Sequence, residues 1–99
     1  MSSLQAKILN LLSGIDDPGI RIEISRTIYY LFQVFQSRPE LEDQIKHDLL
    51  EICFTVYQYR FPDRTVEELK NMADKCADDI LRAFRIESMM RRVVTRTRI

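Results

Sequence analysis

Residues Thr27–Ser37 read TIYYLFQVFQS and contain no charged side chain, although 30% of the 99 residues are charged. The same segment holds four of the nine aromatic residues in the chain. A segment of this composition must be buried on nearly every side. We therefore expect the other elements of the protein to pack around it.

The residues before this segment allow two interpretations. Gly19–Ser25, read GIRIEIS, alternates apolar and polar side chains with a period of two, and the following TIYYLFQVF is rich in residues that favour strands. However, no turn signal occurs between Gly19 and Pro39, and a continuous strand of that length would be abnormal. We therefore predict one helix, capped by Asp17 and with Pro18 at its first position. An α+β domain is the alternative if residues 19–36 or 92–99 form strands.

Apolar residues recur at helical spacing in three further segments. The first segment ends near Gly14, the third begins at Pro39 and ends at FPDR, and the fourth begins at Thr65, where TVEE fits a capping box. The residues expected to face the core of the four helices are Leu4, Ile8, Leu11, Leu12 and Ile15; Ile20, Ile24, Ile28, Leu31 and Phe35; Leu41, Ile45, Leu49, Ile52, Val56 and Tyr59; Val66, Leu69, Ala73, Cys76, Ile80 and Ala83.

These patterns predict an all-α fold, a small four-helix bundle-like domain with a basic C-terminal extension. The helical domain covers residues 1–87 and the Arg-rich extension covers residues 88–99. Only two glycines and three prolines occur in the chain, which argues against a many-turned β-sandwich.

The composition also predicts a cytoplasmic protein. Residues 15–36 are long enough to span a bilayer, but charged side chains interrupt them, so we expect no membrane association. The N-terminus lacks the features of a signal peptide. Cys53 and Cys76 are the only cysteines, and two thiols on apolar helical stripes make no disulfide framework. Whether the two can pair depends on whether their helices are neighbours.

The charge is divided unevenly along the chain. Residues 1–81 carry nine Lys and Arg against fourteen acidic residues, a net −5, whereas residues 82–99 carry six Arg against one Glu, a net +5. Clustered arginines can neutralise phosphates, so an accessory nucleic-acid-binding protein is one hypothesis. Its candidate contacts are Arg85, Arg91, Arg92, Arg96 and Arg98. The alternative is that these cations complement the dipole of a helix end and pair with an acidic body, including that of a second subunit.

A row of metal-ligating residues gives a further hypothesis. His47 lies one turn from Asp43 and one turn from Glu51 on the third predicted helix, and Asp74 and Asp78 form an acidic row on the fourth. If these faces met, they could hold Mg²⁺ or Mn²⁺, as in all-α nucleotide pyrophosphohydrolases. The second acidic element of such enzymes is missing, and a solvated acidic face explains the same residues. No P-loop, dinucleotide fingerprint or nucleophile elbow occurs, so we expect neither a cofactor nor catalysis.

The aromatic residues support a partner-binding function. Tyr29 and Tyr30 point to different faces of one helix, so a four-helix monomer cannot bury both. Tyrosine is enriched at the centres of protein interfaces. We therefore predict a non-enzymatic interaction protein that forms a homodimer, with Tyr29, Tyr30, Phe32 and Phe35 as the anchors.

Overall fold

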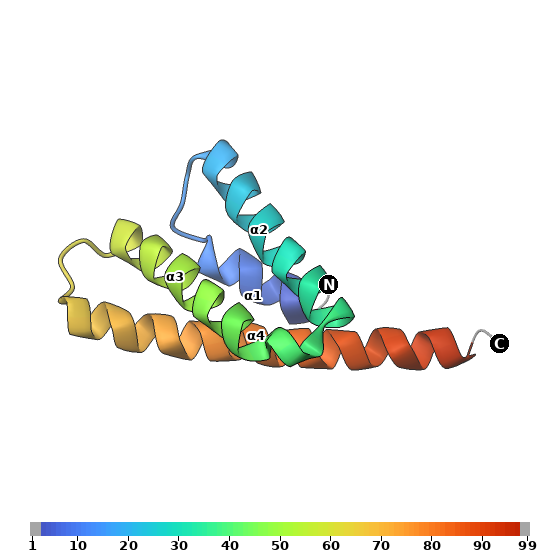
Figure 1. Ribbon diagram of the computed structural model, residues 1–99. Coiled ribbons are helices and arrows are strands. Elements are labelled where there is room, and N and C mark those ends of the chain that lie inside the picture. The colour runs from blue at the N-terminus through green and yellow to red at the C-terminus, as the bar shows by residue number, and fades with distance from the viewer. Residues whose placement is uncertain (1–2, 98–99) are drawn as a thin grey trace.

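A computed structural model describes the backbone from Ser3 to Thr97 and the side chains from Ser3 to Arg91. Within this part the chain is all-α, with no strand, as predicted (Figure 1). A single 3-10 turn at Pro39–Leu41 precedes the third helix. The four helices are α1 (Ser3–Leu11), α2 (Pro18–Ser37), α3 (Glu42–Arg60) and α4 (Val66–Thr97).

Both strand alternatives are wrong within the described residues. Asp17 begins α2 as an N-cap, because its Oδ1 accepts the backbone N–H groups of Gly19 at 2.8 Å and Ile20 at 3.3 Å. These two bonds satisfy donors that a helix leaves free at its start, which favours the helix over the period-two pattern of the segment. At the other end of the chain α4 continues to Thr97, while residues 98–99 lie outside the described part.

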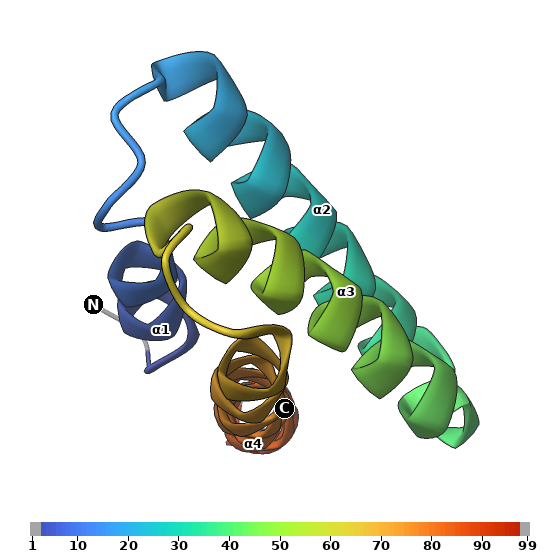
Figure 2. The ribbon, with the colours of Figure 1, turned by 90° about the vertical axis from the view of Figure 1, so that its left-hand side faces the viewer.

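The longest helix, α4, organises the fold. Its capping box forms as predicted: the Glu68 N–H donates to Thr65 Oγ1 at 3.1 Å, and the Thr65 N–H donates to Glu68 Oε1 at 3.4 Å. From there α4 runs for 32 residues, without an end at the predicted boundary between residues 87 and 88. It contacts α1, α2 and α3, and its C-terminal end projects beyond the other helices (Figure 1). Figure 2 shows α1 and α3 on different sides of the α4 axis.

The centre of the core is aromatic. Phe84 of α4 has no exposed surface, and its ring lies 5.3 Å from that of Phe32 and 5.9 Å from that of Phe35, measured between ring centroids. Tilted aromatic pairs at this separation add to the free energy gained by burial.

Most of the residues predicted to face the core are buried or packed against it, but three are wrong. Ile20, Tyr59 and Val66 are exposed.

The helix α2 is only half enclosed, which corrects the prediction that the other elements pack around it. Ile28 and Phe32, in its C-terminal half, are fully or almost fully buried in the core. Ile20 and Ile22, in its N-terminal half, are exposed because this half leans away from α4 (Figure 1). The helix that contacts the other helices most extensively is α4, although α4 carries far more charge.

Two arginines hold the end of α1. Arg21 Nη1 donates to the carbonyl oxygens of Leu12 at 2.8 Å and Ile15 at 2.9 Å, and Arg60 Nη1 donates to that of Leu11 at 2.9 Å. The Leu11 carbonyl is among the last acceptors of α1, which a helix leaves free, whereas Leu12 and Ile15 lie beyond α1 and the Leu12 carbonyl also accepts the N–H of Ile15 at 3.0 Å. Arginines from α2 and α3 thus act as the C-terminal cap of α1, which ends at Leu11 rather than near Gly14.

We expect Asp17→Ala to lower the free energy of unfolding by about 1 kcal/mol, because the substitution removes both N-cap hydrogen bonds of α2. Urea denaturation followed by circular dichroism measures this loss. Asp16→Ala is the matched control, since Asp16 is the neighbouring acidic residue and caps no helix in the structure. Equal midpoints for the two variants would contradict the assignment of the cap.

Candidate interaction surface

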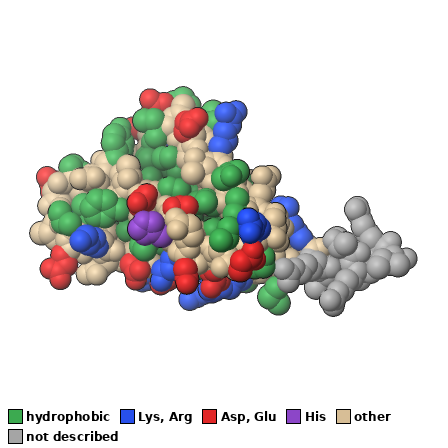
Figure 3. Space-filling view, in the orientation of Figure 1, with side chains coloured by type: hydrophobic (Ala, Val, Ile, Leu, Met, Phe, Trp, Pro, Cys, Tyr) green, Lys and Arg blue, Asp and Glu red, His purple; other side chains and the backbone are tan. Residues whose placement is uncertain are grey.

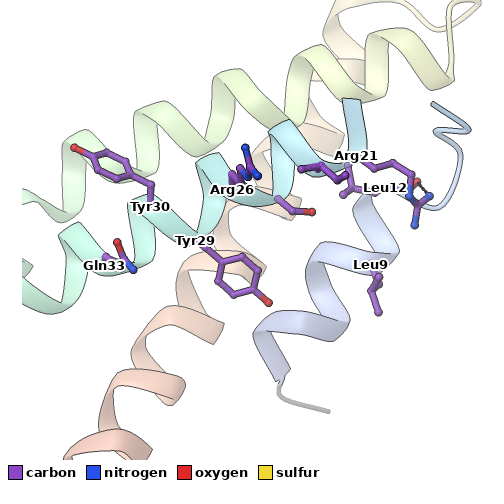
Figure 4. A pocket seen from close by; sticks show the side chains of 9 residues that line it. Leu9, Leu12, Arg21, Arg26, Tyr29, Tyr30 and Gln33 are labelled. Carbon is purple, nitrogen blue, oxygen red and sulfur yellow. Dashed lines mark hydrogen bonds between the residues drawn. The ribbon is translucent and has the colours of Figure 1, made fainter. Parts of the chain in front are cut away.

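A shallow groove runs between α1 and α2 and carries exposed apolar side chains. Leu9 is 42% exposed, Ile22 is 53% exposed and Tyr30 is 63% exposed. The groove encloses about 480 Å³ (Figure 4). We call its lining the α1–α2 face, which consists of Leu9, Leu12, Arg21, Ile22, Ser25, Arg26, Tyr29, Tyr30 and Gln33.

The geometry of the two helices explains why this face stays open. Nine residues of α1 span about 13 Å, whereas the twenty residues of α2 span about 30 Å. The short helix therefore cannot cover the long one. Ile22 and Tyr29 are seven residues apart and fall on the same side of α2. This side faces neither α3 nor α4, so its apolar groups remain in contact with solvent.

The face combines apolar groups with hydrogen-bonding groups. In Figure 4, Tyr29 points from α2 toward α1, while Tyr30 lies on the other side of α2. The guanidinium of Arg21 is fixed at one end by its bonds to the carbonyls of α1, and the side chain of Arg26 adds a second cation. Tyrosine hydroxyls and arginines around apolar groups are typical of interface centres. The face is therefore suited to binding an apolar surface that carries hydrogen-bond acceptors.

Two of the four predicted anchors lie elsewhere. Phe32 is 2% exposed and Phe35 is 7% exposed, because both rings pack against Phe84 in the core. They are not accessible to a partner in this structure, so Tyr29 and Tyr30 remain as candidate anchors. Leu9 and Ile22 belong to the same surface but were not among the predicted anchors. The seven-residue spacing of Ile22 and Tyr29 is the sequence signal that could have identified Ile22.

The two described arginines of the predicted nucleic-acid site contact other parts of the chain. The Nε and Nη2 atoms of Arg85 lie 2.9 Å and 2.8 Å from Glu42 Oε1, which ties α4 to the start of α3. The guanidinium carbon of Arg91 lies 5.1 Å from the ring centroid of Phe32. Arg92 and Arg96 belong to the helical backbone of α4, but their side chains lie outside the described part, as does Arg98. Nucleic-acid binding stays a prediction.

A second group of exposed apolar side chains lies near the projecting end of α4. Ile86, Met89 and Met90 are all exposed, and their spacing of three and four residues places them on one side of the helix. The sequence analysis did not single out this group. The exposure of these three side chains makes them accessible to a partner.

A second groove lies between α3 and α4 and encloses about 630 Å³. Its apolar floor includes Leu50 and Phe54, and three residues of the predicted metal row, His47, Glu51 and Asp74, lie along it. His47 Nε2 lies 3.4 Å from Glu51 Oε1, one turn further along the exposed surface of α3. The complete lining is His47, Leu50, Glu51, Phe54, Thr55, Lys70, Asn71, Ala73 and Asp74.

A lysine takes the place that a metal would need among these acidic groups. Lys46 Nζ lies 2.9 Å from Asp78 Oδ1 and 4.0 Å from Asp74 Oδ1. The hydrogen bond to Asp78, together with the charges of Asp78, Asp74 and Asp43, raises the pKa of Lys46, so the ammonium form is favoured. Among the described residues, no three His, Cys, Asp or Glu side chains lie close enough together to hold a metal ion.

Comparison of the chain with protein-family models, with curated proteins and with solved structures found no match. In the described part, every helix is too short or too polar to cross a membrane.

Proposed function

We propose that this chain is a small, non-enzymatic interaction protein of the cytoplasm that acts as a homodimer joined through the α1–α2 face. The observation that carries the proposal is the exposure of Leu9, Ile22 and Tyr30 around one groove. Apolar groups gathered in this way lose contact with water when a partner covers them, and that loss is the main driving force for association.

A two-fold symmetric contact suits the shape of this face. In such a contact, each copy presents the same helices to the other, so the open side of α2 in one copy covers the open side in its partner. Tyr29 and Tyr30 supply large rings on side chains with few rotatable bonds, so little conformational entropy is lost on binding. Arg26 is exposed on the same side of the helix and belongs to the polar rim that surrounds such a centre.

The charge distribution supports a second copy as the partner. Residues 1–81 are acidic and residues 82–99 are basic, with net charges of −5 and +5. The C-terminal end of α4, which includes Arg92 and Arg96, projects beyond the other helices (Figure 1), whereas Arg85 pairs with Glu42 of its own chain. Two copies can therefore place basic ends against acidic bodies, which steers their association and favours this partner over one of uniform charge.

The proposal predicts that Tyr30→Glu and Ile22→Glu weaken self-association at least tenfold, because each substitution places a carboxylate among the apolar groups of the α1–α2 face. Sedimentation equilibrium or light scattering at several concentrations measures the dissociation constant. Tyr59→Glu is the matched control, since Tyr59 and Tyr30 are both 63% exposed but Tyr59 lies on α3, outside the α1–α2 face.

A wild-type protein that remains monomeric at about 100 μM would refute the homodimer, because a weaker association has little physiological weight. Equal weakening by Tyr30→Glu and Tyr59→Glu would show that a different surface forms the dimer.

A further inference from the structure

Three exposed apolar side chains near the C-terminal end of α4 have no place in the proposed dimer. Ile86 is 42% exposed, Met89 is 64% exposed and Met90 is 60% exposed, and we call this group the α4 patch. Their spacing of three and four residues places them on one side of the helix. Apolar groups gathered in this way are typical of surfaces that bind a protein partner.

The basic surroundings of the α4 patch restrict the partners that can cover it. Arg82, one turn before the patch, is exposed, and residues 82–99 carry six arginines against one glutamate. An apolar surface with acidic groups around it therefore fits this patch best. A second α4 patch is disfavoured because it brings like charges together. The α1–α2 face is disfavoured for the same reason, since its charged lining residues, Arg21 and Arg26, are both basic.

The groove between α3 and α4 has the chemistry that the α4 patch requires. Its floor contains Leu50 and Phe54, and Glu51 and Asp74 lie along it. The side chain of Glu51 is 71% exposed and that of Asp74 is 58% exposed, so both carboxylates are open to a partner. The lining also includes Lys70, which the two carboxylates outnumber. The groove encloses about 630 Å³, which is within the usual range for binding sites, about 300–1,000 Å³.

The helices that form this groove extend its negative charge. Residues 42–51 of α3 carry four acidic side chains against one lysine, and residues 66–79 of α4 carry five against two lysines, a net −3 for each segment. Figure 3 shows acidic side chains near His47, the histidine that lines the groove. The groove therefore lies in an acidic region of the same chain whose C-terminal residues are basic.

The patch and the groove of one molecule cannot meet. Met89 lies 15 residues after Asp74 on the same helix, which separates their backbones by about 22 Å along the axis of α4. Because a continuous helix holds the two surfaces apart, only a second molecule can bring a patch to a groove.

We propose that the α4 patch of one copy docks into the α3–α4 groove of a second copy. The arginines around the patch then lie opposite the acidic side chains around the groove, and the apolar groups of both surfaces leave water together. Methionine is unbranched and flexible, so Met89 and Met90 can adapt to the irregular floor formed by Leu50 and Phe54. A helix laid in an apolar groove is a common mode of protein recognition. Because this contact joins two different surfaces, it leaves the α1–α2 face free and does not depend on the proposed dimer.

The first test measures self-association in the Tyr30→Glu background, in which the α1–α2 contact is weakened. Sedimentation equilibrium at low ionic strength should still detect association of this parent variant. Adding Met89→Glu or Glu51→Lys should weaken the association at least tenfold. Added salt should weaken it too, because opposite charges attract across the contact. An association that neither substitution weakens would overturn the proposal.

Two substitutions outside the contact serve as matched controls in the same background. Tyr59→Glu introduces the same carboxylate as Met89→Glu at a side chain that is 63% exposed, on α3 and outside the groove. Asp16→Lys makes the same charge change as Glu51→Lys in the segment before α2. Both controls should leave the dissociation constant nearly unchanged. Equal weakening by a control and its test variant would also overturn the proposal.

A mixing experiment tests whether the contact joins two different surfaces. In the Tyr30→Glu background, the Met89→Glu protein keeps an intact groove and the Glu51→Lys protein keeps an intact patch. Each should be monomeric alone, whereas an equimolar mixture should form a one-to-one complex with a dissociation constant close to that of the parent variant. A mixture that stays monomeric while the parent associates would overturn the proposal.

The same measurements separate this proposal from the α1–α2 dimer. A Tyr30→Glu protein that is monomeric at about 100 μM would overturn the docking of the α4 patch on a second copy. A wild-type dimer that Tyr30→Glu abolishes would still support the α1–α2 contact. Association that depends on Met89 and Glu51 but not on Tyr30 would support the docking proposal and contradict that dimer.

Discussion

Replacing Phe84 with alanine is expected to lower the free energy of unfolding by about 3–5 kcal/mol, which approaches the whole stability of a domain of this size. Phe84 is fully buried and contacts the rings of Phe32 and Phe35, so its removal opens a cavity where α2 meets α4. These contacts join the C-terminal half of α2 to α4. Thermal denaturation followed by circular dichroism measures the loss.

Phe54→Ala is the matched control for this prediction. The same atoms are removed, but Phe54 is only partly buried and lines the open groove between α3 and α4. We expect a loss of about half that of Phe84→Ala or less, because solvent can fill the space that the ring leaves. Equal losses would show that the aromatic group around Phe84 is not the centre of the core.

The second large effect is expected at Arg60, where replacement by alanine should lower the free energy of unfolding by about 2–3 kcal/mol. The guanidinium donates to the carbonyl of Leu11 at 2.9 Å and lies 5.0 Å from the ring centroid of Phe61 and 5.7 Å from that of Tyr57. The change removes both interactions and leaves the end of α1 without one of its two caps. Urea denaturation of the purified variant measures the loss.

Arg64→Ala is the control for Arg60→Ala, and Gly14→Ala tests whether the position of the Arg60 guanidinium matters for stability. Among the described residues, the side chain of Arg64 pairs with Glu68 alone, on the surface and at 3.1 Å, so Arg64→Ala should cost about 0.5 kcal/mol or less. A Cβ at Gly14 would lie 2.6 Å from Arg60 Nε, so Gly14→Ala must displace the guanidinium. We expect Gly14→Ala to destabilise the wild type but to have almost no effect in the Arg60→Ala background. Additive losses would contradict this account.

The parts of the fold that the sequence predicts correctly depend on local interactions. The N-terminal caps at Asp17 and at Thr65 with Glu68 join residues that are two or three positions apart. A short segment of sequence is therefore enough to recognise these caps. The apolar spacing of α1 is equally local, and all of its predicted core residues are buried. Helix identity and the starts of α2 and α4 could therefore be predicted without tertiary information, whereas Pro39–Leu41 forms a 3-10 turn and α3 begins at Glu42 rather than at the predicted Pro39.

What could not be predicted depends on how the helices meet. Ile20 and Ile22 are exposed because the N-terminal half of α2 leans away from α4. The spacing of apolar residues within α2 does not determine this angle. The cap on Leu11 comes from Arg60, 49 residues away. The same limit applies to the acidic rows, because Lys46 and Asp78 become partners only when α3 packs on α4. The burial of Phe32 and Phe35, two of the four predicted anchors, likewise depends on Phe84 of α4, whose position relative to α2 the sequence does not reveal.

The long α4 gives this molecule of zero net charge a large electric dipole moment. The protein measures 53 × 27 × 17 Å, acidic side chains lie along its body (Figure 3), and five of the six arginines of residues 82–99 belong to the C-terminal half of α4. The dipole of these side-chain charges opposes the dipole of the helix backbone, whose C-terminal end is negative. Two molecules therefore attract most strongly side by side and in opposite directions, and salt weakens that attraction although neither molecule has a net charge.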